Sequence, residues 1–361
     1  MTFVAVPPTD TPGTSTGRPR RSPLPIVLAA LVALALALGA VAAVLVAIDA
    51  GRDEDAVRAA GRAAFGSRRS DDLLESLQDE RNMGSVAVLG MEGAVARPVT
   101  SFPQATAATD EALARVRARL ADEGGATRRA FAPIAEGLGV NLTRLRGQVT
   151  GVRERGLRQL DRAQGVYAGY KTQIDRLLAA DRSLALAVDD PTLRRGARLL
   201  ELGNRQEELS ASLLRETVLM GVSGDRQATG TEEIRPTAEA VSALEATGAE
   251  IDALATGPFA PAARSTAEAR DAALGRAKQA LQTGTPPILR AVDLGGTSGR
   301  AFTTFHDGVA RVMDSHVAAG VGAARDRKAS ATTVAVLLGL AALAATAAAI
   351  VLALTRRRPS G

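Results

Sequence analysis

The sequence predicts an all-α protein in which two transmembrane helices flank an extracytoplasmic domain of two antiparallel helical bundles. Three observations predict this fold. Ala, Leu and Val supply most of the 46% hydrophobic content, whereas aromatic residues make up only 2%, and this composition favours helices over strands. Two uncharged apolar segments lie near the ends of the chain. The long segment between them can be read with helical period almost throughout.

The net charge of +5 comes from the two ends of the chain. Residues 1–25 hold three arginines and one aspartate, and residues 355–361 hold three more arginines. Without these, 38 of the 44 basic and 38 of the 39 acidic residues remain, so the central segment is neutral overall. A nucleic-acid surface would need a basic face on the folded domain. The charge therefore predicts a membrane topology and no nucleic-acid partner.

The first apolar segment runs without a charge from Ile26 to Ile48, which is long enough for a bilayer core of about 30 Å. A cleaved signal peptide is the competing interpretation, but its apolar core usually has only about 7–15 residues. The second segment runs from Val334 to Leu354 and ends against Thr355 and three arginines. We therefore expect two uncleaved spans in a lipid bilayer.

Both spans carry arginine clusters on the side of the chain terminus. The positive-inside rule then places both termini in the cytoplasm of a two-pass plasma-membrane protein. The predicted domains are a disordered cytoplasmic tail at 1–25, spans at 26–48 and 331–354, an extracytoplasmic domain at 49–330 and a short cytoplasmic tail at 355–361. Small residues in the spans permit close helix packing, so we expect a homodimer.

Local signals divide the central segment into helices. Ser70, followed by two aspartates, is a good N-cap, and Asp190 before Pro191 is a strong signal for a new helix. Gly257 and Pro258 separate two further expected helices at 232–255 and 261–283. The last helix should begin at about Ser298. These helices predict one bundle at about 52–190 and a second at about 191–328.

Several motifs then resemble the nitrate- and nitrite-sensing (NIT) domain family. Leu77-Gln78-Asp79-Glu80-Arg81, with the segment 83–90, is similar to its opening motif, and 109–113 to its next helix start. The middle region follows in the expected order, with Leu142, Leu145, Arg146, Tyr170, Ile174, Leu177, Leu178 and Asp189. Segments 207–210 and 213–215 are similar to the second-half motif, although Ala211-Ser212 stands where the family usually has a Glu-Arg pair.

The resemblance implies that the domain binds nitrate or nitrite with arginines at the junction of two bundles. Arg81 matches the arginine of the first motif and is the main candidate, whereas Arg215 and Arg205 are weaker ones. A guanidinium suits a planar anion because its N–H groups form a fork that can meet two oxygens at once. In actinobacterial members this domain lies between the two spans of a sensor histidine kinase. The sequence ends seven residues after Leu354, so we expect a separate cytoplasmic histidine kinase as partner.

Other chemistry has little support. The chain has no Cys, which excludes disulfides, thiolate metal sites and cysteine nucleophiles, and it has only two His. His306 and His316 lie ten residues apart and do not share a helix face as a metal-binding pair would. We therefore expect no enzyme activity, no metal and no cofactor. The alternative to a receptor subunit is a non-signalling membrane scaffold with a helical, protein-binding ectodomain.

Overall fold

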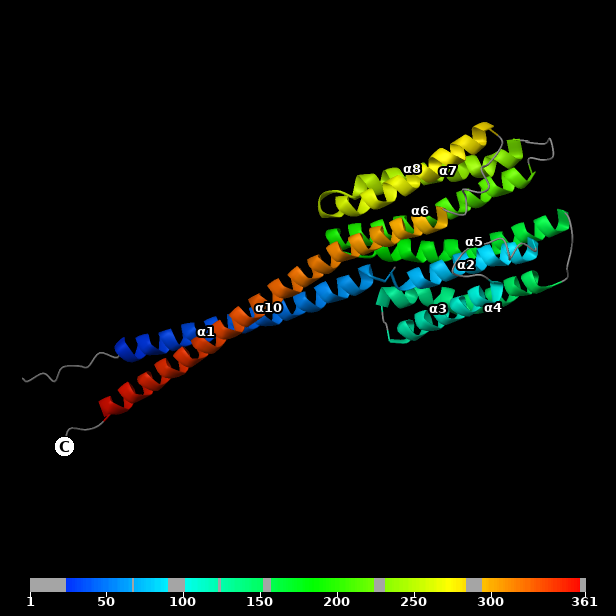
Figure 1. Cartoon of the computed structure of the whole chain (residues 1–361). Coiled ribbons are helices and arrows are strands. Elements are labelled where there is room, and N and C mark those ends of the chain that lie inside the picture. The colour runs from blue at the N-terminus through cyan, green and yellow to red at the C-terminus, as the bar shows by residue number, and fades with distance from the viewer. Residues whose placement is uncertain are drawn as a thin grey trace, which may run out of the picture. The chain divides into compact units, whose positions relative to one another are not determined.

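The computed structural model describes residues 24–66, 68–89, 101–122, 125–151, 157–223, 231–283 and 294–357 (Figure 1). Of the tails predicted at 1–25 and 355–361, residues 24–25 and 355–357 are described and are helical, and the rest lies outside the described residues. The helices are α1 (Leu24–Ala64), α2 (Arg68–Leu89), α3 (Phe102–Asp122), α4 (Gly125–Thr150), α5 (Leu157–Leu186), α6 (Pro191–Ser223), α7 (Thr231–Leu254), α8 (Ala260–Thr283) and α10 (Leu294–Arg357), with a 3-10 turn η2 (Gly257–Phe259) before α8. No strand occurs in the described residues, and the all-α prediction is confirmed.

The chain forms two compact units, and the long helices α1 and α10 each contribute residues to both. One unit, which we call the terminal-helix unit, comprises residues up to Arg52 and from Ala324 onward. The other, which we call the helical domain, runs from Asp53 to Ala323.

In the terminal-helix unit, α1 and α10 run antiparallel and pack closely. A Cβ atom on Gly39 would lie 3.1 Å from Leu338, and one on Gly51 would lie 3.8 Å from Lys328. The large apolar side chains of both helices are mostly exposed, as for Leu337, which is 61% exposed. Both helices are long and apolar enough to cross a membrane.

The first bundle of the helical domain consists of α2, α3, α4 and α5. Its core is built from leucines, isoleucine and aromatics that recur at helical spacing along the four helices. They include Leu73, Leu77, Leu113, Val116, Phe131, Leu138, Leu142, Leu145, Tyr170, Ile174 and Leu177. Ser70, the predicted N-cap of α2, does not cap the helix, because α2 already begins at Arg68. The hydroxyl of Ser70 donates instead to Asp181 on α5 at 3.0 Å.

The second bundle consists of α6, α7, α8 and the part of α10 within the helical domain (Figure 1). Asp190 caps α6 as expected, since its Oδ1 accepts from the backbone N–H groups of Thr192 and Leu193, both at 2.9 Å. The break between α7 and α8 also lies at Gly257 as predicted, with φ of +58°. The last helix begins at Leu294, earlier than the expected Ser298.

Two reciprocal contacts join α1 and α10 within the helical domain. A Cβ atom on Gly61 of α1 would lie 2.9 Å from Val317 of α10, and a Cβ atom on Gly320 of α10 would lie 3.1 Å from Val57 of α1. Each helix thus places a glycine against a valine of the other. The missing side chains allow the two backbones to approach closely.

We predict opposite effects for two glycine-to-alanine changes. Gly203 on α6 is buried, and its Cβ would lie 2.5 Å from Phe305 and 2.7 Å from His306, so Gly203→Ala should destabilise by about 1–3 kcal/mol through overpacking. Gly165 on α5 has no atom within 4 Å of a Cβ, so Gly165→Ala should stabilise by up to about 1 kcal/mol through helix propensity. Denaturant unfolding of the detergent-solubilised full chain measures both. Equal midpoints for the two variants would contradict this packing.

Candidate functional site

Polar side chains line the junction where α2 of the first bundle faces α6 of the second, and we call this junction the interbundle seam. It is connected by hydrogen bonds from α2 to α6 and from α6 to α2. On α2 it includes Asp71, Glu75, Gln78, Asp79 and Arg81, and on α6 it includes Asn204, Glu207, Glu208 and Ser212. Each of these residues has another of its set three or four positions away on the same helix, which places each set on one side of its helix.

Arg81 lies at the centre of this seam and is fully buried. Its Nη1 donates to Oε1 of Glu208, while Gln78 donates to Oε2 of the same carboxylate at 3.1 Å. The hydroxyl of Ser212 also donates to Glu208, at 3.3 Å. The ring of Tyr167 on α5 lies beneath the guanidinium, with 4.4 Å from Cζ to the ring centre, and its hydroxyl is 3.0 Å from that of Ser212.

One edge of the Arg81 guanidinium is left unused. Among the described residues, no hydrogen-bond acceptor is within reach of Nε and Nη2, although both atoms are buried. These two nitrogens form the side-on edge of the fork, which can donate two parallel hydrogen bonds to a planar oxyanion. A buried donor without a partner costs about 1–3 kcal/mol of stability, so an acceptor that bound to this edge would recover that free energy.

A second arginine near the seam uses its guanidinium for hydrogen bonds within the protein. Arg146 on α4 donates to both oxygens of buried Glu80, at 2.7 and 3.0 Å, and to Asp110 and the carbonyl of Thr106. The hydrogen bond to Glu80 raises the pKa of Arg146 above its usual value. The hydroxyl of Tyr170 donates to the same carboxylate at 2.6 Å, and burial beside Glu80 raises the pKa of Tyr170. Arg146 therefore stabilises the first bundle and is not open to a ligand.

The seam is rich in carboxyl groups, and burial alters their titration. Burial raises the pKa of Glu207 to about 8, with further increases from Glu75, Asp71, Glu208 and Asp79. The pKa of Asp181 on α5 lies well above its usual value, because the carboxyl is fully buried and close to Asp71. A pKa of about 8 keeps the proton on Glu207 at neutral pH.

The sequence-predicted residues have different positions. Arg81 lies in the seam, whereas Arg205 is 37% exposed and pairs with Glu201 at 3.0 Å. Arg215 belongs to α6, but its side chain lies outside the described residues. Sequence reasoning did not identify Tyr167 or Glu208 as neighbours of Arg81. The only available signal was that Glu208 lies in the quoted second-half motif.

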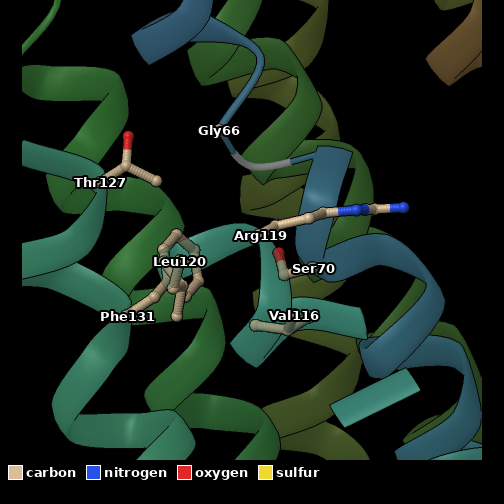
Figure 2. Close-up of a pocket in the computed structure, with 7 residues that line it drawn as sticks. All are labelled: Gly66, Ser70, Val116, Arg119, Leu120, Thr127 and Phe131. Atoms are coloured by element: carbon tan, nitrogen blue, oxygen red, sulfur yellow. The ribbon is translucent and has the colours of Figure 1, made fainter. Parts of the chain in front are cut away.

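Neither a metal site nor a second ligand pocket is found in the described residues. In the described part of the chain, no group of three or more His, Asp or Glu side chains could hold a metal ion. A cavity of about 10 Å³ is lined by Ser70, Leu120, Thr127 and Phe131 among others. Figure 2 shows these residues, with the Arg119 side chain extending away from them. This volume is close to the lower limit for one water molecule, so the cavity is too small for a four-atom oxyanion.

Comparison with known proteins shows to which family the chain belongs. The model of a family described as nitrate and nitrite sensing, NIT, matches residues 72–287. The chain belongs to the NIT family. No curated protein matches the NIT chain. A solved structure, that of the NasR transcription antiterminator, is similar with a TM-score of 0.52 and 17% identity, over 81% of this chain and 82% of that chain. At this identity the likeness shows the fold alone.

Removing Arg146 should be costly. Arg146→Met leaves the fully buried carboxylate of Glu80 without its main partner, so we expect a loss of about 3–5 kcal/mol in unfolding free energy. Arg115→Met removes an ion pair with Glu111 whose side chains are 41% and 74% exposed, so it should cost at most about 1 kcal/mol. Denaturant unfolding compares the two variants. A small effect of Arg146→Met would show that Glu80 does not depend on this pair.

Stability should fall as pH rises. Glu207 keeps its proton in the folded chain to about pH 8 but loses it near 4.5 when unfolded. The folded state therefore binds more protons in this interval, and the contribution of Glu207 is fully present below about pH 4.5 and lost as pH rises through about 8. In thermal unfolding between these pH values, the Tm of Glu207→Gln should decrease less with rising pH than the Tm of the unchanged protein. Identical slopes would contradict the shifted pKa.

Proposed function

We propose that this NIT domain binds nitrate or nitrite at Arg81 in the interbundle seam and signals the binding across a membrane. The observation that carries the proposal is that Nε and Nη2 of the fully buried Arg81 have no hydrogen-bond partner among the described residues. The chain also belongs to a nitrate- and nitrite-sensing family. Nitrate is planar and carries one negative charge, so two of its oxygens match the two N–H groups of that edge.

Binding at this place would change the packing between the bundles. Nε and Nη2 are closed off from solvent, so an entering anion has to widen the seam or displace side chains around Arg81. The ligand can shift the packing only by the difference in its affinity for the two arrangements. Glu208 is the side chain most directly affected, because it shares the same guanidinium.

A membrane location is supported by the exposure of the apolar helices. Only 6% of the most apolar window of α1, and none of that of α10, is buried. A core helix of a soluble protein would be mostly buried, so these surfaces fit contact with lipid. We propose a two-pass protein with cytoplasmic termini and an extracytoplasmic helical domain. A cytoplasmic protein such as a histidine kinase would read the signal, and the receptor would act as a homodimer.

Calorimetric titration of the full chain in detergent with sodium nitrate, sodium nitrite and sodium chloride tests the proposal. We expect saturable binding of nitrate or nitrite and none of chloride. Because Arg81→Ala leaves Glu208 buried and unpaired, the better variant is Arg81→Met combined with Glu208→Gln, which removes both charges together. This double variant should fold and should not bind either oxyanion.

The matched control is Arg205→Ala, which removes another arginine that pairs with a carboxylate but lies more than a third exposed. It should bind with unchanged affinity. Absence of heat with both oxyanions in the folded, unchanged protein would overturn the proposal. Unchanged binding by the Arg81→Met, Glu208→Gln variant would show that the anion does not bind at Arg81.

A further inference from the structure

Arg81 already pairs with one carboxylate of the protein itself. Its Nη1 donates to Oε1 of Glu208, and the two side chains are 0% and 3% exposed. Two further donors hold this carboxylate: Gln78 donates to Oε2 at 3.1 Å, and Ser212 donates to Oε1 at 3.3 Å. Residues of both α2 and α6 therefore keep Glu208 on the guanidinium.

The contacts of Arg81 direct an anion to one edge of its guanidinium. The ring of Tyr167 covers one face, with 4.4 Å from Cζ to the ring centre, and Glu208 takes Nη1. Nε and Nη2 are the nitrogens for which the described residues supply no acceptor. An anion bound to them lies in the plane of the guanidinium, beside the carboxylate of Glu208 on the same cation.

Two negative groups on one guanidinium repel each other. Arg81 has a single positive charge, which Glu208 already balances. Among the described residues, no other arginine or lysine is hydrogen-bonded to Glu208. Like charges placed side by side in a buried site weaken binding strongly, because little water is present to screen them. Only an anion whose hydrogen bonds to Nε and Nη2 exceed this repulsion can bind.

We infer that Glu208 is a built-in competitor of the ligand, which sets both the affinity and the selectivity of the anion site. This inference rests on the proposed binding of nitrate or nitrite at Arg81. A planar oxyanion places two oxygens against Nε and Nη2 at once, whereas a chloride ion is one sphere and cannot align with two parallel N–H groups. Chloride gains less at this edge, so the repulsion from Glu208 excludes chloride and admits the oxyanion.

The test is Glu208→Gln, which keeps the shape of the side chain and removes its charge. Calorimetric titration of the detergent-solubilised full chain, in chloride-free buffer at constant ionic strength, measures the Kd for sodium nitrate and separately for sodium chloride. We expect the nitrate affinity to rise by at least about tenfold, because Arg81 and the anion then form a neutral pair. Chloride should give no binding in the unchanged protein and saturable binding in the variant.

The matched control is Glu201→Gln. Glu201 is also a fully buried carboxylate of α6, but its partners are Arg198 and Arg205. This variant loses a comparable ion pair, so its stability should fall, yet its Kd for nitrate should not change.

A second variant, Glu208→Asp, keeps a carboxylate in the seam and withdraws it from Nη1 by one methylene. It should fold even if Glu208→Gln does not, and it should bind nitrate more tightly than the unchanged protein by a smaller factor.

The outcomes separate this inference from the proposed function. Equal or weaker nitrate binding by Glu208→Gln, or by Glu208→Asp where the first variant does not fold, would overturn the competitor role and leave the proposed function intact. An equal gain in affinity in Glu201→Gln would also overturn it, because the effect would then not belong to the partner of Arg81. Binding that appears only in the Glu208 variants would support the competitor role but overturn the proposed function. No anion binding by any of the folded proteins would overturn both.

Discussion

A buried guanidinium needs a carboxylate, and in this protein the two are supplied by different bundles. Arg81 comes from α2 and Glu208 from α6, 127 residues later in the chain. Each group would be strongly destabilising in the interior without the other. The pair therefore ties the two bundles together at one point, and the hydrogen bonds of Gln78 and Ser212 hold Glu208 in position.

Neighbouring residues on α2 contact different bundles on the two sides of the helix. Glu80 points into the first bundle, where Arg146 and Tyr170 use its carboxylate fully. Arg81, one residue on and about 100° around the helix, points into the seam and keeps two donors unused. The short motif that contains both residues thus places one charged side chain in the first bundle and one in the seam.

The sequence was sufficient for features that depend on local chemistry. The helical class followed from composition, and the start of α6 followed from Asp190 and Pro191. The choice of Arg81 came from its motif, and the structure buries this side chain between the bundles. Features that depend on distant contacts were not accessible. Ser70 is a good N-cap by type, yet its hydroxyl binds Asp181, 111 residues away. Likewise nothing local to Glu208 or Tyr167 indicates that they meet Arg81, because that meeting depends on how two bundles pack.

The reciprocal glycine and valine contacts of α1 and α10 have a mechanical consequence. Val317 fits at Gly61 and Val57 fits at Gly320, so each helix holds the other at two levels. Moving one helix along its axis past the other would drive a valine against the adjoining helical turn, and packed interiors resist such overlap. Piston-like sliding of α10 against α1 is thereby disfavoured. Motion that leaves the contacts intact, such as a joint tilt or a rolling of both helices together, is the movement this pair can carry.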